Sequence, residues 1–213
     1  MILAYHAIFT AYGFWLPNDP RGSWSDMVRA WEFRRFGPAT KVETTQSVAA
    51  RPHDRKSRKA AKESLRYPPV SFDGLQARAI ACGFANFVKR SGVEIWACAI
   101  LPEHVHLVIA RHTYEVEQIV NLLKGDATRQ LKEEDIHPHK AFKRSNGRVH
   151  GCWSRHEWKV FLDSEADIVR AIRYVEGNPE KERKKPQRWN FVKTFSGEPQ
   201  ATEVPEIVAG SVA

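Results

Sequence analysis

The stretch IWACAILPEHVHLVIARH, residues 95–112, contains two apolar runs on either side of a short turn at Pro102. Runs of this length that are rich in β-formers and broken by a turn predict an antiparallel hairpin. The second run opens with His104-Val105-His106. Side chains alternate between the faces of a strand, so the two imidazoles share one face at a spacing of about 7 Å. Two histidines so placed can converge on one metal ion, or they can lie on the solvated face of an amphipathic strand.

The sequence on both sides of the hairpin predicts an α+β protein. The expected elements are a strand at 3–10, a helix at 72–90, strands at 93–101 and 104–110, a helix at 113–134, a strand at 158–162 and a helix at 163–179. Apolar residues at helical spacing support the first helix, and Ser91-Gly92 ends it. The order is that of the split βαβ, or ferredoxin-like, fold, an antiparallel sheet with helices on one face. A C-terminal helix follows it.

The length of 213 residues favours one domain with additions. We assign residues 1–194 to this domain. Residues 23–70 mix aromatic residues with Arg and Lys, and we interpret them as a basic insertion. Residues 195–213 are low in charge and contain several Pro and Gly residues, which is typical of a loose tail. The insertion is open to two interpretations, a solvated charged segment or an arm that binds nucleic acid through phosphate contacts and stacking.

The net charge indicates the class of binding partner, and the cysteine content indicates the redox compartment. The chain has 33 Lys and Arg against 25 Asp and Glu, a formal net charge of +8. This excess favours a polyanionic partner, with nucleic acid ahead of an acidic membrane surface. Three widely spaced cysteines without a C-x-x-C pair predict a reduced, cytoplasmic protein without a structural zinc site. The first residues lack the basic region of a signal peptide and are too polar for a membrane span, so we expect no membrane partner.

Several enzymes with paired histidines are excluded by what the sequence lacks. A nucleobase deaminase needs H-x-E followed by P-C-x-x-C, and a zinc metalloprotease needs H-E-x-x-H on a helix. Neither motif is present. A two-histidine phosphoesterase needs a second H-x-[ST] motif, which the sequence RHT at 111–113 does not supply.

The last predicted helix adds two polar side chains to the histidine pair. In IRYVEGNP, Tyr174 and Asn178 are four residues apart, which places both on one face of a helix. Tyr174 is compatible with an ordinary amphipathic helix, and an Asn before Pro commonly ends one. Their combination with the histidine pair and the ferredoxin-like order favours a shared site.

With these motifs together, the sequence resembles the HUH-type single-tyrosine transposases of IS200-like elements, in particular the REP-associated tyrosine transposases. The similarity lies in ILPEHVHLVI and RAIRYVEGNPEK, and the opening YHAIFTAYGFWLPNDPRGSW resembles the family's first strand and loop. It covers about 1–20 and 72–193. One departure is NPEKER in place of the usual NPVKAG, which makes the segment after the last helix unusually charged.

The resemblance implies an enzyme that cuts single-stranded DNA with a tyrosine hydroxyl, leaving a 5′-phosphotyrosine and a free 3′-OH. By motif position, Tyr174 is the expected nucleophile, and His104, His106 and Asn178 are the expected ligands of Mg²⁺ or Mn²⁺. A phenol is a weak nucleophile at neutral pH, and a cation on a phosphate oxygen stabilises the charge that develops in the transition state. The expected partner is single-stranded or hairpin DNA, bound by a monomer or homodimer.

Further DNA contacts are expected from basic and polar side chains outside the motifs. The candidates are His6 in the first strand, Lys124, Arg129 and Lys132 on the second helix and Arg144 in the basic loop at 137–148. Tyr5 and Tyr114 are alternative nucleophiles with less support. The alternative functions are a domesticated nucleic-acid-binding protein that no longer cuts, and a nickase related to relaxases or replication initiators. No residue of the sequence is an evident general base for Tyr174.

Overall fold

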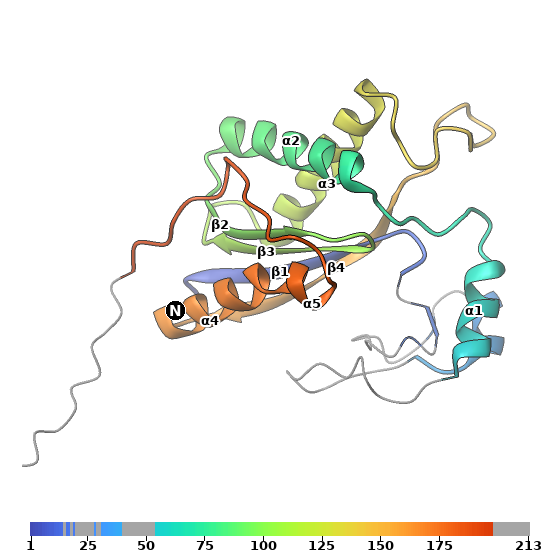
Figure 1. Ribbon diagram of the computed structural model, residues 1–213, viewed down its shortest axis with the longest axis horizontal. Helices are drawn as coiled ribbons and strands as arrows, with labels where there is room; N and C mark the ends of the chain where they lie inside the picture. The colour runs from blue at the N-terminus through green and yellow to red at the C-terminus, as the bar shows by residue number, and fades with distance from the viewer. Residues whose placement is uncertain (15, 18, 20–27, 29–30, 40–53, 198–213) are drawn as a thin grey trace, which may run out of the picture.

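The fold is that of a four-stranded antiparallel sheet with helices on both faces. The computed structural model describes residues 1–14, 16–17, 19, 28, 31–39 and 54–197 (Figure 1). Strands β1 (Ala4–Ala11), β2 (Ile95–Ile100), β3 (His104–Ala110) and β4 (Trp153–Leu162) form the sheet in the order β2-β3-β1-β4. All three pairings are antiparallel. This arrangement confirms the ferredoxin-like class that the sequence predicts.

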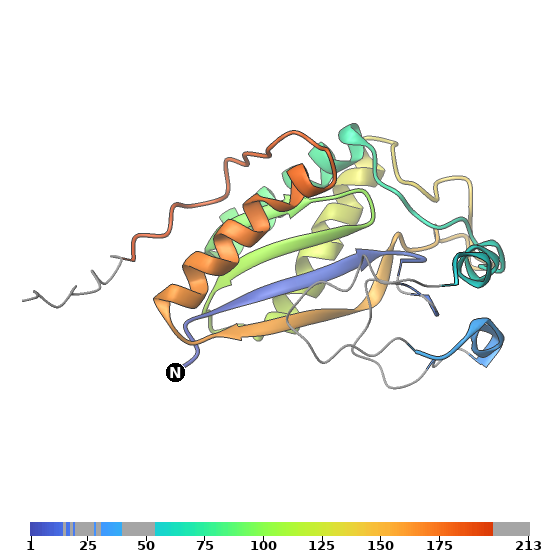
Figure 2. The same cartoon turned by 60° about the horizontal axis from the view of Figure 1, so that its bottom comes forward.

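Helices α2 (Gly74–Ser91) and α3 (Val116–Glu133) cover one face of the sheet, and α4 (Glu165–Glu176) crosses the other (Figures 1 and 2). The short helix α5 (Asn178–Lys181) follows α4 directly. Two hydrophobic clusters match these layers. The larger joins Phe9, Leu107 and Ile109 to α2 and α3, and the smaller joins Val108 and Ala99 to α4. The faces alternate along each strand, as the pleat requires.

Local sequence explains where α2 begins and how closely it packs. Asp73 caps the helix, because its carboxylate accepts from the backbone N–H of Gln76 while the Gln76 side chain accepts from the Asp73 N–H. Gly83 lies against α3, and a β-carbon at this position would come within 2.7 Å of the Ala127 backbone. The two helices therefore approach so closely that only glycine fits at this position.

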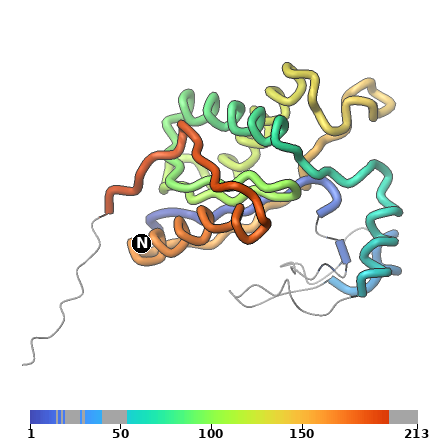
Figure 3. Tube along the Cα trace, viewed as in Figure 1, coloured from blue at the N-terminus to red at the C-terminus, as the bar shows by residue number. Residues whose placement is uncertain are grey.

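The chain leaves the sheet after β1 and returns to it, at the end of the insertion, close to the same place. The described part of it contains the 3-10 helix η1 (Trp31–Phe36) and helix α1 (Arg55–Glu63), which extend beyond the sheet (Figure 3). The Val70 N–H donates to the Tyr12 carbonyl at 2.9 Å, so the chain returns to the place where it left β1. Part of the 23–70 segment and most of the predicted tail, 198–213, lie outside the described residues.

The chain after α5 covers the edge strand β2. Gln187 donates to the Ile100 carbonyl and accepts from the Ile100 N–H, at 2.7 and 2.8 Å. Val192 pairs with Ile95, and Phe195 packs on Trp96 with ring centroids 4.7 Å apart. These contacts occupy backbone groups that an uncovered edge strand would leave open to pairing with another chain.

Two predicted boundaries were wrong. Strand β4 begins at Trp153 rather than 158. The helix expected over 163–179 is interrupted at Gly177, so Asn178 belongs to α5 and Tyr174 to α4. Pro179 explains the interruption, because it has no N–H to donate and disfavours the helical conformation of the residue before it. None of the helices in the described part of the chain has both the length and the apolar character to cross a bilayer.

Candidate functional site

The two motif histidines lie on the sheet face that α4 covers. His104 pairs with Thr10 and His106 with Ile8 on β1, and both imidazoles share the face of Val108 in the smaller cluster. Their ring centroids are 4.9 Å apart. His106 is buried, and His104 contacts the Phe14 ring at 5.1 Å. The alternation predicted from the sequence is therefore present, and it aims both rings at α4.

His6, which the sequence analysis names as a candidate DNA contact, lies next to His106 and forms a cluster with the two motif histidines. Its Nε2 lies 3.1 Å from Nδ1 of His106, and both residues are buried. Burial lowers the pKa of His6 to about 4. The pKa of His106 lies well below its usual range because of burial and, less strongly, the nearby charges of His104, His6 and Lys181. Both rings are therefore neutral at pH 7, the state in which an imidazole offers a lone pair to a metal.

Tyr174 projects from α4 onto this pair. Its ring meets His6 and His106 edge-on, with centroids 5.6 and 5.7 Å apart. The side chain keeps 42% of its surface exposed, so the phenol is accessible from solvent. Burial of the remainder raises its pKa above the usual value. The ammonium of Lys181, on α5, lies 4.1 Å from the centre of the Tyr174 ring, the arrangement of a cation–π contact.

Two further polar residues, Asn178 and Glu182, lie at the start and at the end of α5. Asn178 is buried, and its Nδ2 atom has no hydrogen-bond partner among the described residues. The O and N atoms of a side-chain amide can be exchanged by turning the group over. The position now taken by Nδ2 can therefore hold either the NH2 group or the oxygen of Asn178. Glu182, at the end of α5, places a carboxylate oxygen 3.8 Å from His104 Nε2. Glu182 was missed by the sequence analysis, although its spacing of four residues from Asn178 indicates a common helical face.

Among the basic candidates, Lys124 differs from the expectation. It is 7% exposed, and its ammonium donates to the carbonyls of Ser154 and His156 at 3.1 and 3.4 Å. The expectation of an exposed DNA contact was wrong for this residue, because Lys124 lies on the buried face of α3 with Val120 and Ala127. Burial lowers its pKa to about 8.

The other basic candidates remain exposed, and a DNA contact stays a prediction for each. Arg129 forms an ion pair with the buried Asp126 and still has 64% of its side chain exposed. Lys132 and Arg144 are exposed on α3 and in the loop that follows it.

The alternative tyrosines lie away from the histidine pair. Tyr5 is on the opposite face of β1, in the larger hydrophobic cluster, with its ring against Phe161. Tyr114 precedes α3 and contacts His112, with ring centroids 4.9 Å apart. Tyr174 is therefore the tyrosine that the described structure brings next to His6 and His106.

A second group of histidines lies in the basic loop at 137–148 and directly after it. His139 is buried, with Nε2 2.9 Å from the Pro68 carbonyl and Nδ1 3.2 Å from that of Gly151. His150 stacks on Tyr67 at a centroid distance of 4.0 Å. Across the described residues, no three or more His, Cys, Asp or Glu side chains are arranged as a ready-made metal centre. His139 thus joins the insertion to the loop before β4.

The chain belongs to the IS200-like transposase family, whose model, Transposase IS200 like, matches residues 72–178, half of the chain. The matched segment contains His104, His106, Tyr174 and Asn178. The resemblance noted from the sequence motifs is thereby confirmed at the level of the family.

The solved structures similar to the chain include two transposases. One is a REP-associated tyrosine transposase bound to a REP hairpin, with 17% identity and a TM-score of 0.41 over 55% of this chain and 63% of that one. The other is a candidate transposase from Deinococcus radiodurans R1, with 15% identity and a TM-score of 0.37 over 83% of this chain and 91% of that one. No curated protein sequence matches the chain significantly.

Proposed function

We propose that the protein is a metal-dependent endonuclease and strand transferase for single-stranded DNA, which cuts through a 5′-phosphotyrosine and rejoins strands at hairpin-forming DNA in the cytoplasm. The observation that carries the proposal is the position of Tyr174, whose half-exposed ring lies 5.7 Å from that of His106 on one face of the sheet. The nucleophile and two imidazoles at this position, together with the amide of Asn178 four residues after Tyr174, are the parts that such a transesterification needs.

The side chains fit a divalent cation. His104, His106 and Asn178 would hold it, because the histidine rings share one face and the buried amide of Asn178 has an open hydrogen-bonding position. Imidazole nitrogen together with amide and substrate oxygens suits Mn²⁺ and tolerates Mg²⁺. When bound, the ion would supply Lewis-acid stabilisation of charge on a non-bridging phosphate oxygen.

In the proposed reaction, the Tyr174 hydroxyl oxygen attacks the scissile phosphorus. The bond from this oxygen to phosphorus forms while the bond from phosphorus to the 3′ oxygen breaks. The tyrosine hydroxyl loses its proton, and the departing 3′ oxygen takes one up and becomes a free 3′-OH. Lys181 lies against the Tyr174 ring, where its positive charge favours the phenolate that develops during the attack. The covalent ester conserves the energy of the broken bond, so reversal with a new 3′-OH joins strands.

The experiment is an adduct assay on the full chain. Labelled single-stranded oligonucleotides with hairpins are incubated with the protein and Mn²⁺ or Mg²⁺, and we expect a labelled protein band that survives SDS. Tyr174→Phe should give no band, while Tyr114→Phe, a matched control at an exposed tyrosine, should keep it. A wild type without an adduct across such substrates, or a Tyr174→Phe variant with one, would contradict the proposal. A DNA mobility shift that needs no metal and yields no adduct would instead identify a non-cleaving binding protein.

A further inference from the structure

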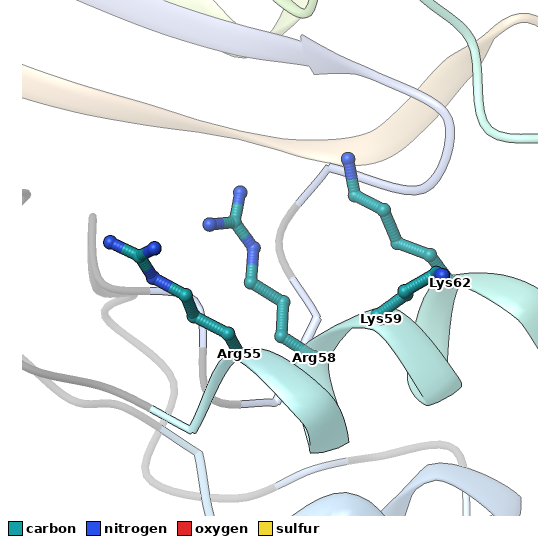
Figure 4. A pocket seen from close by; sticks show the side chains of 4 residues that line it. All are labelled: Arg55, Arg58, Lys59 and Lys62. Carbon is teal, nitrogen blue, oxygen red and sulfur yellow. The ribbon is translucent and has the colours of Figure 1, made fainter.

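Helix α1 gathers four basic side chains around one hollow. Arg55, Arg58, Lys59 and Lys62 line an open pocket of about 370 Å³ (Figure 4). Their spacing of three, four and seven residues along the chain places them on neighbouring positions of one helical face. In Figure 4 the side chains of Arg55, Arg58 and Lys62 point to the same side of the helix. Among the residues that the structure describes, the lining contains no acidic side chain.

Two of these side chains attach α1 to the edge of the histidine site. Lys62 donates to the carboxylate of Glu103 at 2.8 Å, and Glu103 directly precedes His104 at the start of β3. Arg58 lies 3.7 Å from the carboxylate of the buried Asp19. The pair of Lys62 with Glu103 holds the C-terminal end of α1 next to the start of the strand that carries the motif histidines, and the pair of Arg58 with Asp19 ties the first half of α1 to the segment after β1.

The other two basic side chains remain available to a ligand. Arg55 is exposed and has no ion-pair partner among the described residues. Lys59 is 80% exposed, and its contact with Glu63, four residues on, is a solvated pair at 3.7 Å. Such exposed pairs contribute little stability, so an incoming anion can displace Glu63 at small cost.

The length of the basic face indicates a polyanion rather than a single phosphate. From Arg55 to Lys62 the helix rises by about 10 Å, at 1.5 Å per residue. One phosphate group would meet one or two of these cations, whereas a string of phosphates can meet the whole row. Guanidinium groups bind phosphate oxygens through two parallel hydrogen bonds, and ammonium groups add point charges.

We propose that α1 binds the sugar–phosphate backbone of single-stranded DNA beside the cleavage point, with Arg55 and Lys59 as the main contacts. The inference rests on the proposed function, since the DNA strand at the histidine site is what α1 would contact. Helix α1 lies before residue 72, where the family match begins, so the contact would be a property added by the insertion.

The test measures the salt dependence of DNA binding without cleavage. Fluorescence anisotropy with a labelled single-stranded hairpin oligonucleotide compares Tyr174→Phe alone with Tyr174→Phe carrying Arg55→Gln and Lys59→Gln. The control carries Lys89→Gln and Arg111→Gln, which remove the same charge at exposed positions of α2 and after β3. We expect the slope of log affinity against log salt to fall by about 1.4 with the α1 changes, at about 0.7 for each phosphate of a single strand that the protein no longer neutralises. The control should keep the slope.

Each outcome separates this inference from the proposed function. If the slope is unchanged in the α1 variant while the wild type forms the adduct, the α1 inference is wrong and the enzyme assignment stands. If the slope falls equally in the α1 and control variants, the effect is one of net charge, and the inference also fails. A protein that binds no single-stranded DNA at any salt concentration would overturn both.

Discussion

The Nε2 atom of His6 lies 3.1 Å from Nδ1 of His106, which connects β1 to the motif strand β3, the other central strand of the sheet. If His106 Nδ1 donates this hydrogen bond, Nε2 of His106 is left with its lone pair free for a metal. A partner on the second ring nitrogen fixes the orientation and tautomer of a ligating histidine. His6 thus has the position of a supporting residue for the proposed metal site rather than that of a DNA contact.

Replacement of His6 should therefore weaken metal binding. We expect His6→Leu to lower the affinity for Mn²⁺ about 10–100-fold, the usual cost of removing a supporting partner. His6→Gln keeps an acceptor and should recover part of the affinity. The measurement is calorimetric titration of Mn²⁺ into the Tyr174→Phe protein, with the exposed His156→Gln as the matched control. Equal affinities for His6→Leu and the control would rule out this supporting role.

Lys181 should affect the chemical step more than DNA binding. Its ammonium lies 4.1 Å from the centre of the Tyr174 ring, and burial raises the pKa of that phenol. Removal of the cation with Lys181→Met should slow adduct formation about tenfold, which corresponds to roughly 1.4 kcal/mol of transition-state stabilisation. Rates at saturating DNA should be compared with those of Lys185→Met, an exposed neighbour. A decrease in DNA affinity with an unchanged rate would contradict this assignment.

Because Lys124 is buried, we expect the free energy of unfolding to increase at alkaline pH. Its pKa in the folded protein is about 8, because burial disfavours the charged ammonium, and in the unfolded chain it is about 10.4. Between these values the unfolded chain binds more protons, so the free energy of unfolding increases as pH rises. Across this window the wild type should gain roughly 3 kcal/mol relative to Lys124→Met, as measured by urea denaturation.

The exposed residue Lys132 provides the control for the Lys124 experiment. Lys132 is on the same helix but faces solvent, so Lys132→Met and wild type should respond to pH in parallel. Parallel curves for wild type and Lys124→Met as well would show that the buried ammonium does not govern stability here. The Lys124→Met change should also leave the salt dependence of DNA binding unchanged.

Two glycines give opposite predictions for the same substitution. Gly83→Ala places a methyl group 2.7 Å from the Ala127 backbone and should lower the free energy of unfolding by about 1–3 kcal/mol. Gly125, within α3, has nothing within 4 Å of the added carbon, so Gly125→Ala should raise stability by about 1 kcal/mol. Denaturant midpoints would measure both. A neutral Gly83→Ala would mean that α2 and α3 can move apart at no cost in stability.

Local sequence patterns predicted the elements that carry the site. The turn at Pro102 and the alternation through Val105 placed both histidines on one face, and the ferredoxin-like order followed from the succession of periodicities. The motif resemblance supplied Tyr174 and Asn178. These features depend on residues close together in the sequence, so they can be read without a structure.

What the sequence did not predict depends on contacts between distant residues. The pairing of His6 with His106 requires the register of β1 against β3, which no local pattern fixes. Lys124 was misread because a long basic side chain is usually exposed, although its spacing from Val120 and Ala127 indicates the buried stripe. Glu182 reaches His104 from the end of α5, a separate short helix that the sequence analysis did not predict.

The hydrogen bond between Val70 and Tyr12 gives the insertion the character of an exchangeable module. A segment whose two ends meet at one backbone contact can be lengthened, shortened or replaced without moving β1 before it or α2 after it, because loop closure depends only weakly on loop length. Selection could therefore vary α1 independently of the residues that surround Tyr174. The same attachment makes the position a natural graft point, where a different DNA-contacting segment could redirect the site to another target.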